Sequence, residues 1–128
     1  MKKISIITPC YNEENNVREC YQAVKEVVTQ SLPNYRYEHI FADNASTDGT
    51  LARLKEIAAQ DQNVKVISNS RNVGPFRNMW NAMKSASGDA VIPLLPADLQ
   101  DPPSVIPQFV SNWESGDLVV YGVRANRE

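Results

Sequence analysis

Short apolar runs alternate with stretches of helical periodicity along this chain, and no other feature of the sequence constrains the fold as strongly. β-Branched or near-continuous apolar runs bounded by turn residues predict strands that are buried on both faces. The first such run contains Ile4, Ile6 and Ile7 and ends at Thr8-Pro9. The other predicted strands cover 37–42, 64–67, 90–95 and 118–121.

Helices are predicted between these strands, because apolar residues there recur every three or four positions. Asn15 or Asn16 is expected to open the first helix, Asp48-Gly49 the second, and Pro102 the fourth. Together, the strands and helices predict a single α/β domain with a mostly parallel sheet and helices on both faces. The expected buried faces are Val17, Cys20, Tyr21, Val24, Val27 and Val28; Leu51, Leu54, Ile57 and Ala58; Phe76, Met79, Trp80 and Met83; and Val105, Phe109, Val110 and Trp113.

Polar side chains gather where the predicted strands end. In a parallel sheet, ligands bind outside the carboxyl ends of the strands. We therefore expect the candidate functional residues to meet at that edge. They are Thr8, Asn12, Asp43, Asn44 and Asp98.

The segment 94–103 places Asp98 and Asp101 directly after a hydrophobic run. Carboxylates at the end of a buried strand are costly unless a positive group accompanies them, and a divalent cation that carries phosphate oxygens would serve. Asp101 has an alternative role as the N-cap of a helix whose first turn holds Pro102 and Pro103. Asp98 has no such alternative and carries the metal hypothesis.

The segment 43–50 is a second polar cluster. Asp43 could accept hydrogen bonds from a ribose hydroxyl or a base N–H. Taken alone, a turn in which Asp43 and Asp48 bond local backbone amides is the favoured interpretation. The sequence contains no glycine-rich phosphate loop. A bound nucleotide would therefore need a metal and basic side chains, such as Arg71 and Arg77.

Composition narrows the possible partners. A net charge of −2 and a pI near 5.4 argue against nucleic acid or an anionic membrane as the main partner. Cys10 and Cys20 form neither a disulfide framework nor a zinc motif, and the sequence holds no run long enough for a membrane span. We expect the chain as given to be cytoplasmic. Its oligomeric state is not predicted.

Four ordered motifs together resemble the inverting glycosyltransferases of family 2, and most closely the polyprenyl-phosphate (dolichol-phosphate-type) branch. The motifs are TPCYNEENNV, DNASTDGT, SRNVG and ADLQDPP, and the tail DLVVYGVRANRE also resembles that branch. The resemblance implies a GT-A fold and a nucleotide-diphosphate sugar donor, with a uridine donor favoured and a guanosine donor possible. The donor-binding residues that it implies are Pro9, Tyr11, Glu13, Asp43, Ser46 and Asp98.

The same resemblance implies that Asp98 binds Mg²⁺ or Mn²⁺, with help from Asp101. The family usually has an Asp-x-Asp pair, but Pro96 occupies the first position here. Members also continue past this point into the region that supplies the catalytic base, the acceptor site and, in this branch, C-terminal membrane helices. Residues 1–128 are therefore expected to be the donor-binding part of a longer protein at the cytoplasmic face of the membrane, where it builds cell-envelope polysaccharide on polyprenyl phosphate. No catalytic residue is assigned.

Two other functions stay open: a sugar-nucleotidyltransferase, and a non-catalytic module that binds a nucleotide sugar. The first would normally show a glycine-rich basic loop after the first strand, which this chain lacks. Among the remaining residues, His39 is expected to be structural, and Trp80 and Trp113 are expected to lie in the core. Cys10 is a candidate for the pocket wall, without a nucleophilic role.

Overall fold

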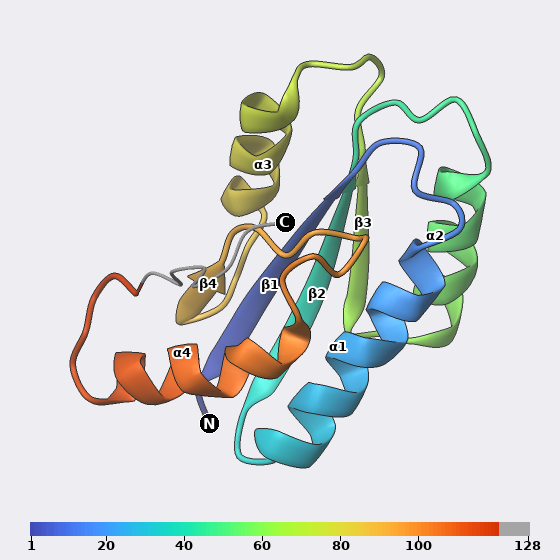
Figure 1. The fold of residues 1–128 in the computed structure, drawn as a ribbon. Helices are drawn as coiled ribbons and strands as arrows, with labels where there is room; N and C mark the ends of the chain where they lie inside the picture. The colour runs from blue at the N-terminus through green and yellow to red at the C-terminus, as the bar shows by residue number, and fades with distance from the viewer. Residues whose placement is uncertain (121–128) are drawn as a thin grey trace.

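The computed structural model describes residues 1–120, which form a parallel sheet covered by helices (Figure 1). The strand order is β3-β2-β1-β4, and every pair is parallel. The α/β fold predicted from the sequence is therefore confirmed. The strands are β1 (Lys3–Cys10), β2 (Arg36–Asp43), β3 (Val64–Ser68) and β4 (Ala90–Ile92).

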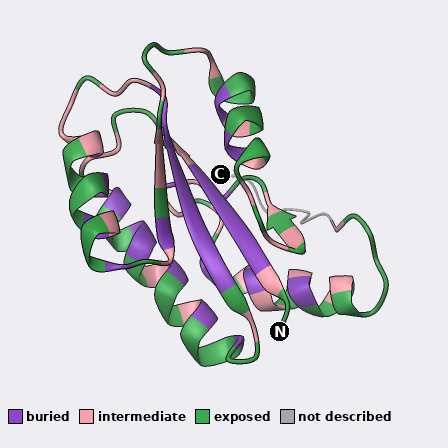
Figure 2. Cartoon of the chain, turned by 180° about the vertical axis from the view of Figure 1, so that it is seen from behind, coloured by how far each residue is buried: buried purple, intermediate pink, exposed green. Residues whose placement is uncertain are grey.

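Helices cover both faces of this sheet, again as predicted. On one face, α1, α2 and α4 enclose the main hydrophobic core, whereas α3 packs on the other face against Ile7, Ile40 and Ala42. Seen from behind, the central strands are almost wholly buried (Figure 2). The helices are α1 (Val17–Ser31), α2 (Thr50–Gln60), α3 (Pro75–Lys84) and α4 (Ile106–Glu114), the last preceded by the 3₁₀ turn η1 (Pro103–Val105).

The fourth predicted strand is shorter than expected, and the fifth is not formed. β4 ends at Ile92 because Pro93 has no N–H to donate. The chain still follows β1, since the Leu95 amide donates to the Ile7 carbonyl at 2.8 Å. Residues 118–120 form no strand, and Tyr121 lies outside the described residues. In the described part of the chain, β4 is therefore an edge strand.

Helix α3 faces the sheet only partly with the side predicted: Met83 packs on the core as expected, but Phe76 and Trp80 do not. Asn78 and Ala82 are buried, whereas Phe76 is 79% exposed and Trp80 is 58% exposed. The prediction that Trp80 lies in the core was wrong. Hydrogen bonding explains the difference, because the Asn78 side chain donates to the Ala42 carbonyl of β2 and so turns this polar face inward. Trp113, by contrast, is partly buried against the core, as predicted.

A buried carboxylate fastens β4 at the amino edge of the sheet. Glu38 accepts hydrogen bonds from Ser5, from the Ser87 amide and from Lys65, whose Nζ lies 2.7 Å away. Burial alone would raise the pKa of Glu38, but Lys65 and Ser87 lower it to about 2. The carboxylate is thus ionised at neutral pH and ties the segment before β4 to the middle of the sheet.

His39 is buried on β2, and its predicted structural role is consistent with its contacts. Its Nε2 lies 2.8 Å from the hydroxyl oxygen of Thr8, and its ring packs on Phe41. Burial lowers the pKa of His39 to about 3, so the ring is neutral in the folded state. Thr8 is fully buried as well. Both residues therefore belong to the interior beneath the sheet edge and not to its surface.

Candidate functional site

Loops from four places in the sequence surround the carboxyl edge of the sheet: residues 11–16, 44–49, 69–74 and 93–102 (Figure 1). Strand pairing brings them together, since Cys10 of β1 is in register with Asp43 of β2, and Asp43 with Ser68 of β3. On the other side of β1, the Leu95 amide is hydrogen-bonded to the Ile7 carbonyl. The segments that carry Asp43 and Asp98 therefore flank β1 at the same edge.

The first two loops are locked together through Asn12. Its side-chain oxygen accepts hydrogen bonds from the backbone amides of Thr47 and Asp48, at 2.8 and 3.3 Å. Its backbone N–H donates to the hydroxyl oxygen of Ser46. Asn12 has a positive φ of 53°, a conformation that asparagine tolerates better than most residues. The two loops thus form one preorganised unit.

Asp43 lies at the base of this unit and is almost fully buried. Its carboxylate accepts one hydrogen bond from the Ser46 hydroxyl, at 2.5 Å, and another from the Ser46 amide, at 3.3 Å. The turn interpretation is therefore correct for its contacts within the chain. The nucleoside contact that the resemblance implies stays a prediction.

The other residues implied for the base and ribose pocket line the same loops. Tyr11 is half exposed, and Pro9 is partly exposed near the carboxyl end of β1. Glu13 is held in place, because its amide donates to Thr50 and its carboxylate accepts from Asn16. An exposed ring beside restrained polar groups can stack on a base.

A network of asparagines holds the third loop, and the sequence interpretation missed most of it. The Asn44 oxygen accepts from the Asn69 side chain and from the Val73 amide, while its side-chain nitrogen donates to Asn72. Asn69 also donates to Asn78 on α3. The signal in the sequence was Asn78, a polar residue within the helical repeat. The network fixes the loop that carries Arg71.

Asp98 is exposed at the carboxyl edge, on a turn where Leu99 has a φ of 61°. One of its oxygens accepts from the Gln100 amide at 3.2 Å. Asp101 is partly exposed, and the 3₁₀ turn that follows is capped by Pro102, so the predicted helix start is displaced along the chain. Within residues 1–120 no group of three or more acidic, histidine or cysteine side chains is assembled for a metal.

The carboxylates of Asp98 and Asp101 still fit a hard cation that binds together with the diphosphate of the sugar donor. Mg²⁺ is commonly held by one or two carboxylates together with substrate phosphates and water, without a full protein cage. Asp98 is accessible for such a role, and Asp101 follows it on the same loop. Pro96, in place of a second acidic residue, leaves the site with fewer charges.

Neither cysteine has the properties of a nucleophile. Burial raises the pKa of both thiols, to about 11 for Cys20. The nearby Cys20 and Asp43 raise the pKa of Cys10 further. Cys10 is almost fully buried, with its thiol turned to the Thr8 carbonyl. It therefore lies behind the pocket wall, with little exposure to a ligand.

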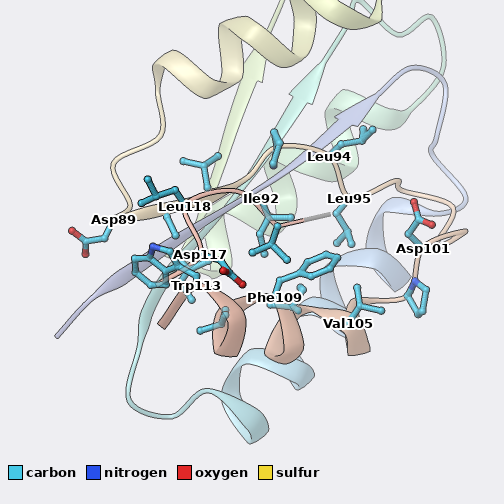
Figure 3. A pocket seen from close by; sticks show the side chains of 18 of the residues that line it. Asp89, Ile92, Leu94, Leu95, Asp101, Val105, Phe109, Trp113, Asp117 and Leu118 are labelled. Atoms are coloured by element: carbon cyan, nitrogen blue, oxygen red, sulfur yellow. The ribbon is translucent and has the colours of Figure 1, made fainter. Parts of the chain in front are cut away.

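A cavity of about 810 Å³ lies apart from the Asn12–Asp43 unit. It opens between β4 and α4, and Figure 3 shows Ile92, Leu95, Val105 and Phe109 pointing into it, with Asp101 at one end. Its wall is mainly apolar and carries none of the residues implied for the base and ribose pocket. It runs along the open edge of β4.

Comparison with known proteins settles the family. Residues 5–128 match the family described as Glycosyl transferase family 2. The chain belongs to this family. It is 40% identical over 124 residues to the uncharacterized glycosyltransferase YkcC of Bacillus subtilis, a match that covers 97% of this chain and 38% of that protein. It is 37% identical over 125 residues to the bactoprenol glucosyl transferase of Shigella phage SfV, and this match covers 98% of this chain and 40% of that protein.

Solved structures confirm the GT-A fold. The chain superposes on S. aureus TarS, solved with UDP-GlcNAc, with a TM-score of 0.69 and 26% identity, over 88% of this chain and 31% of that one. The Pyrobaculum calidifontis mannosyltransferase PcManGT, solved with GDP-Man and Mn²⁺, gives a TM-score of 0.71 at 22% identity, over 85% of this chain and 31% of that one. This family 2 domain thus spans roughly two fifths of the two relatives' length. No helix among residues 1–120 is long and apolar enough to cross a membrane.

Proposed function

We propose that this domain is the donor-binding part of a glycosyltransferase that transfers a sugar, with inversion, from a nucleotide-diphosphate sugar to polyprenyl phosphate. The observation that carries the proposal is the meeting of the Asn12–Asp43 unit and the Asp98 loop at one edge of the sheet. The first provides a polar, restrained place for a nucleoside, and the second an accessible carboxylate for the diphosphate. The bactoprenol glucosyl transferases among the relatives support the lipid-phosphate acceptor.

Three groups of the chain perform separate parts of donor binding. Tyr11 stacks on the base, and Asp43 together with Ser46 accepts and donates hydrogen bonds at the nucleoside. Glu13, already fixed by Thr50 and Asn16, limits where the ribose lies. Because these loops are bonded to one another before any ligand binds, little ordering is required on binding.

Asp98, with help from Asp101, would hold Mg²⁺ or Mn²⁺ at the diphosphate. Such a cation offsets the negative charge that develops on the departing nucleoside diphosphate. The neighbouring structures solved with Mn²⁺ support a divalent metal. A uridine donor is favoured, and the UDP complexes among the neighbours support this choice, while a guanosine donor remains the alternative.

Inversion requires a base that deprotonates the acceptor on the face opposite the departing nucleotide. Among the acidic residues at the edge, Glu13, Asp43, Asp98 and Asp101 are assigned to the donor side. Glu14 and Asp48 accept hydrogen bonds from Gly49 and Thr50 and are assigned to the loop structure. The base is therefore proposed to lie in a part of the protein beyond residue 128, which also provides the acceptor site. In the longer protein, this domain would act at the cytoplasmic face of the membrane.

The proposal is tested by assaying transfer from UDP-sugars to polyprenyl phosphate by mass spectrometry, with residues 1–128 and with the longer protein. We expect the longer protein to transfer the sugar and residues 1–128 to bind the donor with only slow hydrolysis. Robust transfer by residues 1–128 would show that the base lies within them. Donor binding without transfer by either protein would favour a non-catalytic nucleotide-sugar module.

A further inference from the structure

Helix α3 presents an unusual surface to solvent. Phe76 is 79% exposed and Trp80 is 58% exposed, although large aromatic side chains are normally buried. They lie one helical turn apart, so they form a single stripe along the helix. Met79 and Met83 next to the stripe are partly buried, and Met83 packs on the cluster of Ile7, Ile40 and Ala42.

Positive charge lies next to this stripe. Arg77 and Lys84 are exposed on α3, and the helix contains no acidic residue. Neither cation takes part in an ion pair among residues 1–120, a property that they share with Arg36, Arg53, Lys55 and Arg71. We call Phe76, Arg77, Trp80 and Lys84 the outer face of α3.

The position of this face relates it to the donor-binding edge. Helix α3 starts at Pro75, directly after the loop held by the asparagine network, and Asn78 is bonded to Ala42 near the carboxyl end of β2. The helix covers its side of the sheet, and Figure 2 shows no other helix of residues 1–120 over its outer surface. The outer face therefore lies beside the edge where the donor is proposed to bind.

We propose that the outer face of α3 docks on an anionic lipid surface. Phe76 and Trp80 would insert between lipid headgroups, and Arg77 and Lys84 would contact lipid phosphates. Helices that lie in the membrane interface combine an apolar face containing tryptophan or phenylalanine with flanking lysine and arginine. Docking here would hold the donor-binding edge close to the bilayer. The inference rests on the proposed lipid-phosphate acceptor.

The charge of the whole chain does not oppose this inference. A net charge of −2 disfavours a general attraction to anionic lipid, but attraction falls off within a Debye length of about 8 Å at physiological salt. The charges nearest to the bilayer therefore determine whether the chain is attracted to anionic lipid, and on α3 these charges are positive. A second copy of the chain would carry the same cations on its outer face, which disfavours self-association through this surface.

The test is flotation of the chain with vesicles of phosphatidylcholine alone or mixed equally with phosphatidylglycerol, without donor or polyprenyl phosphate. We expect binding to the mixed vesicles only. Phe76→Ser with Trp80→Ser should abolish it, and each of Arg77→Ser and Lys84→Ser should weaken it about fivefold. Matched controls are Arg53→Ser with Lys55→Ser on α2, and Leu118→Ser with Val119→Ser, neither of which should change binding.

Fluorescence locates the contact on α3 directly. The sequence has two tryptophans, so Trp113→Phe leaves Trp80 as the single reporter. Its emission should shift to shorter wavelength on mixed vesicles and be quenched by brominated lipid. Absence of vesicle binding, binding that survives loss of both aromatic residues, or dimerisation through this face would each overturn the inference. Because no donor or acceptor is present, such a failure would leave the proposed transferase activity untouched.

Discussion

Asp43 and Ser46 are joined by two hydrogen bonds, one from the Ser46 hydroxyl and one from its amide, both to the Asp43 carboxylate. The carboxylate therefore shapes the loop at the same edge where it is proposed to contact the nucleoside. Its structural role and its binding role overlap, and mutations can separate them.

Asp43→Ala should weaken UDP binding by roughly tenfold to a hundredfold, since hydrogen bonds to a charged group contribute about 1.5–3 kcal/mol. The loss should be the same with and without metal. Thr47→Ala is the control, because it removes a hydroxyl hydrogen bond to Asn12 in the same loop and leaves the Asp43 carboxylate in place. Calorimetry in both conditions measures these effects, and an Asp43→Ala variant with unchanged UDP affinity would rule out the nucleoside contact.

His39 should make the domain sensitive to mild acid. Its pKa is about 3 in the folded state, against an ordinary value of 6.5, so the unfolded chain binds a proton first as the pH falls. The stabilisation is complete above pH 6.5 and is lost progressively toward pH 3. Between about pH 6.5 and 4.5 the free energy of unfolding should fall by about 2 kcal/mol.

Urea titrations across this pH window measure that slope. His39→Gln should flatten it, and His39→Asn is a second variant in case the first folds poorly. Glu38 does not interfere, because its contribution is lost only as the pH falls from about 4.5 toward its folded pKa of about 2. An equally steep slope in both His39 variants would mean that another group causes it.

Glu38→Gln should destabilise the domain by about 1–3 kcal/mol, because Ser5, Ser87 and Lys65 then face a weaker acceptor. Donor affinity should not change, since Glu38 lies at the amino edge of the sheet. Chemical denaturation and UDP titration of the same variant check both statements. A loss of affinity in a variant that remains folded would contradict the separation of the two edges.

The sequence predicted the sheet and its edge well, because buried parallel strands read as continuous apolar runs. The prediction failed where a hydrogen bond of a side chain determines which face of a helix is buried. The periodicity of α3 does not reveal that the Asn78 side chain donates a hydrogen bond to the Ala42 carbonyl of β2. This hydrogen bond turns Phe76 and Trp80 outward. Likewise, Pro93 ends β4 early, although the run from Ala90 to Leu95 is almost wholly apolar.

For the candidate site, the sequence identified the right loops and missed how they are joined. Asp43 and Asp98 follow strands that flank β1, so topology alone brings them to one edge. The contacts from Asn12 to residues 47 and 48, and those among Asn44, Asn69 and Asn72, depend on loop conformation. A positive φ at Asn12 cannot be read from the motif.

The central claim is that this edge binds a nucleoside diphosphate with a divalent cation at Asp98. Calorimetric titration of UDP into the chain, once in Mn²⁺ and once in EDTA, tests it most directly. We predict an affinity about tenfold or more higher in Mn²⁺, and loss of that difference in Asp98→Asn with the affinity in EDTA unchanged. Equal affinity in Mn²⁺ and EDTA for the unmodified chain would contradict the account.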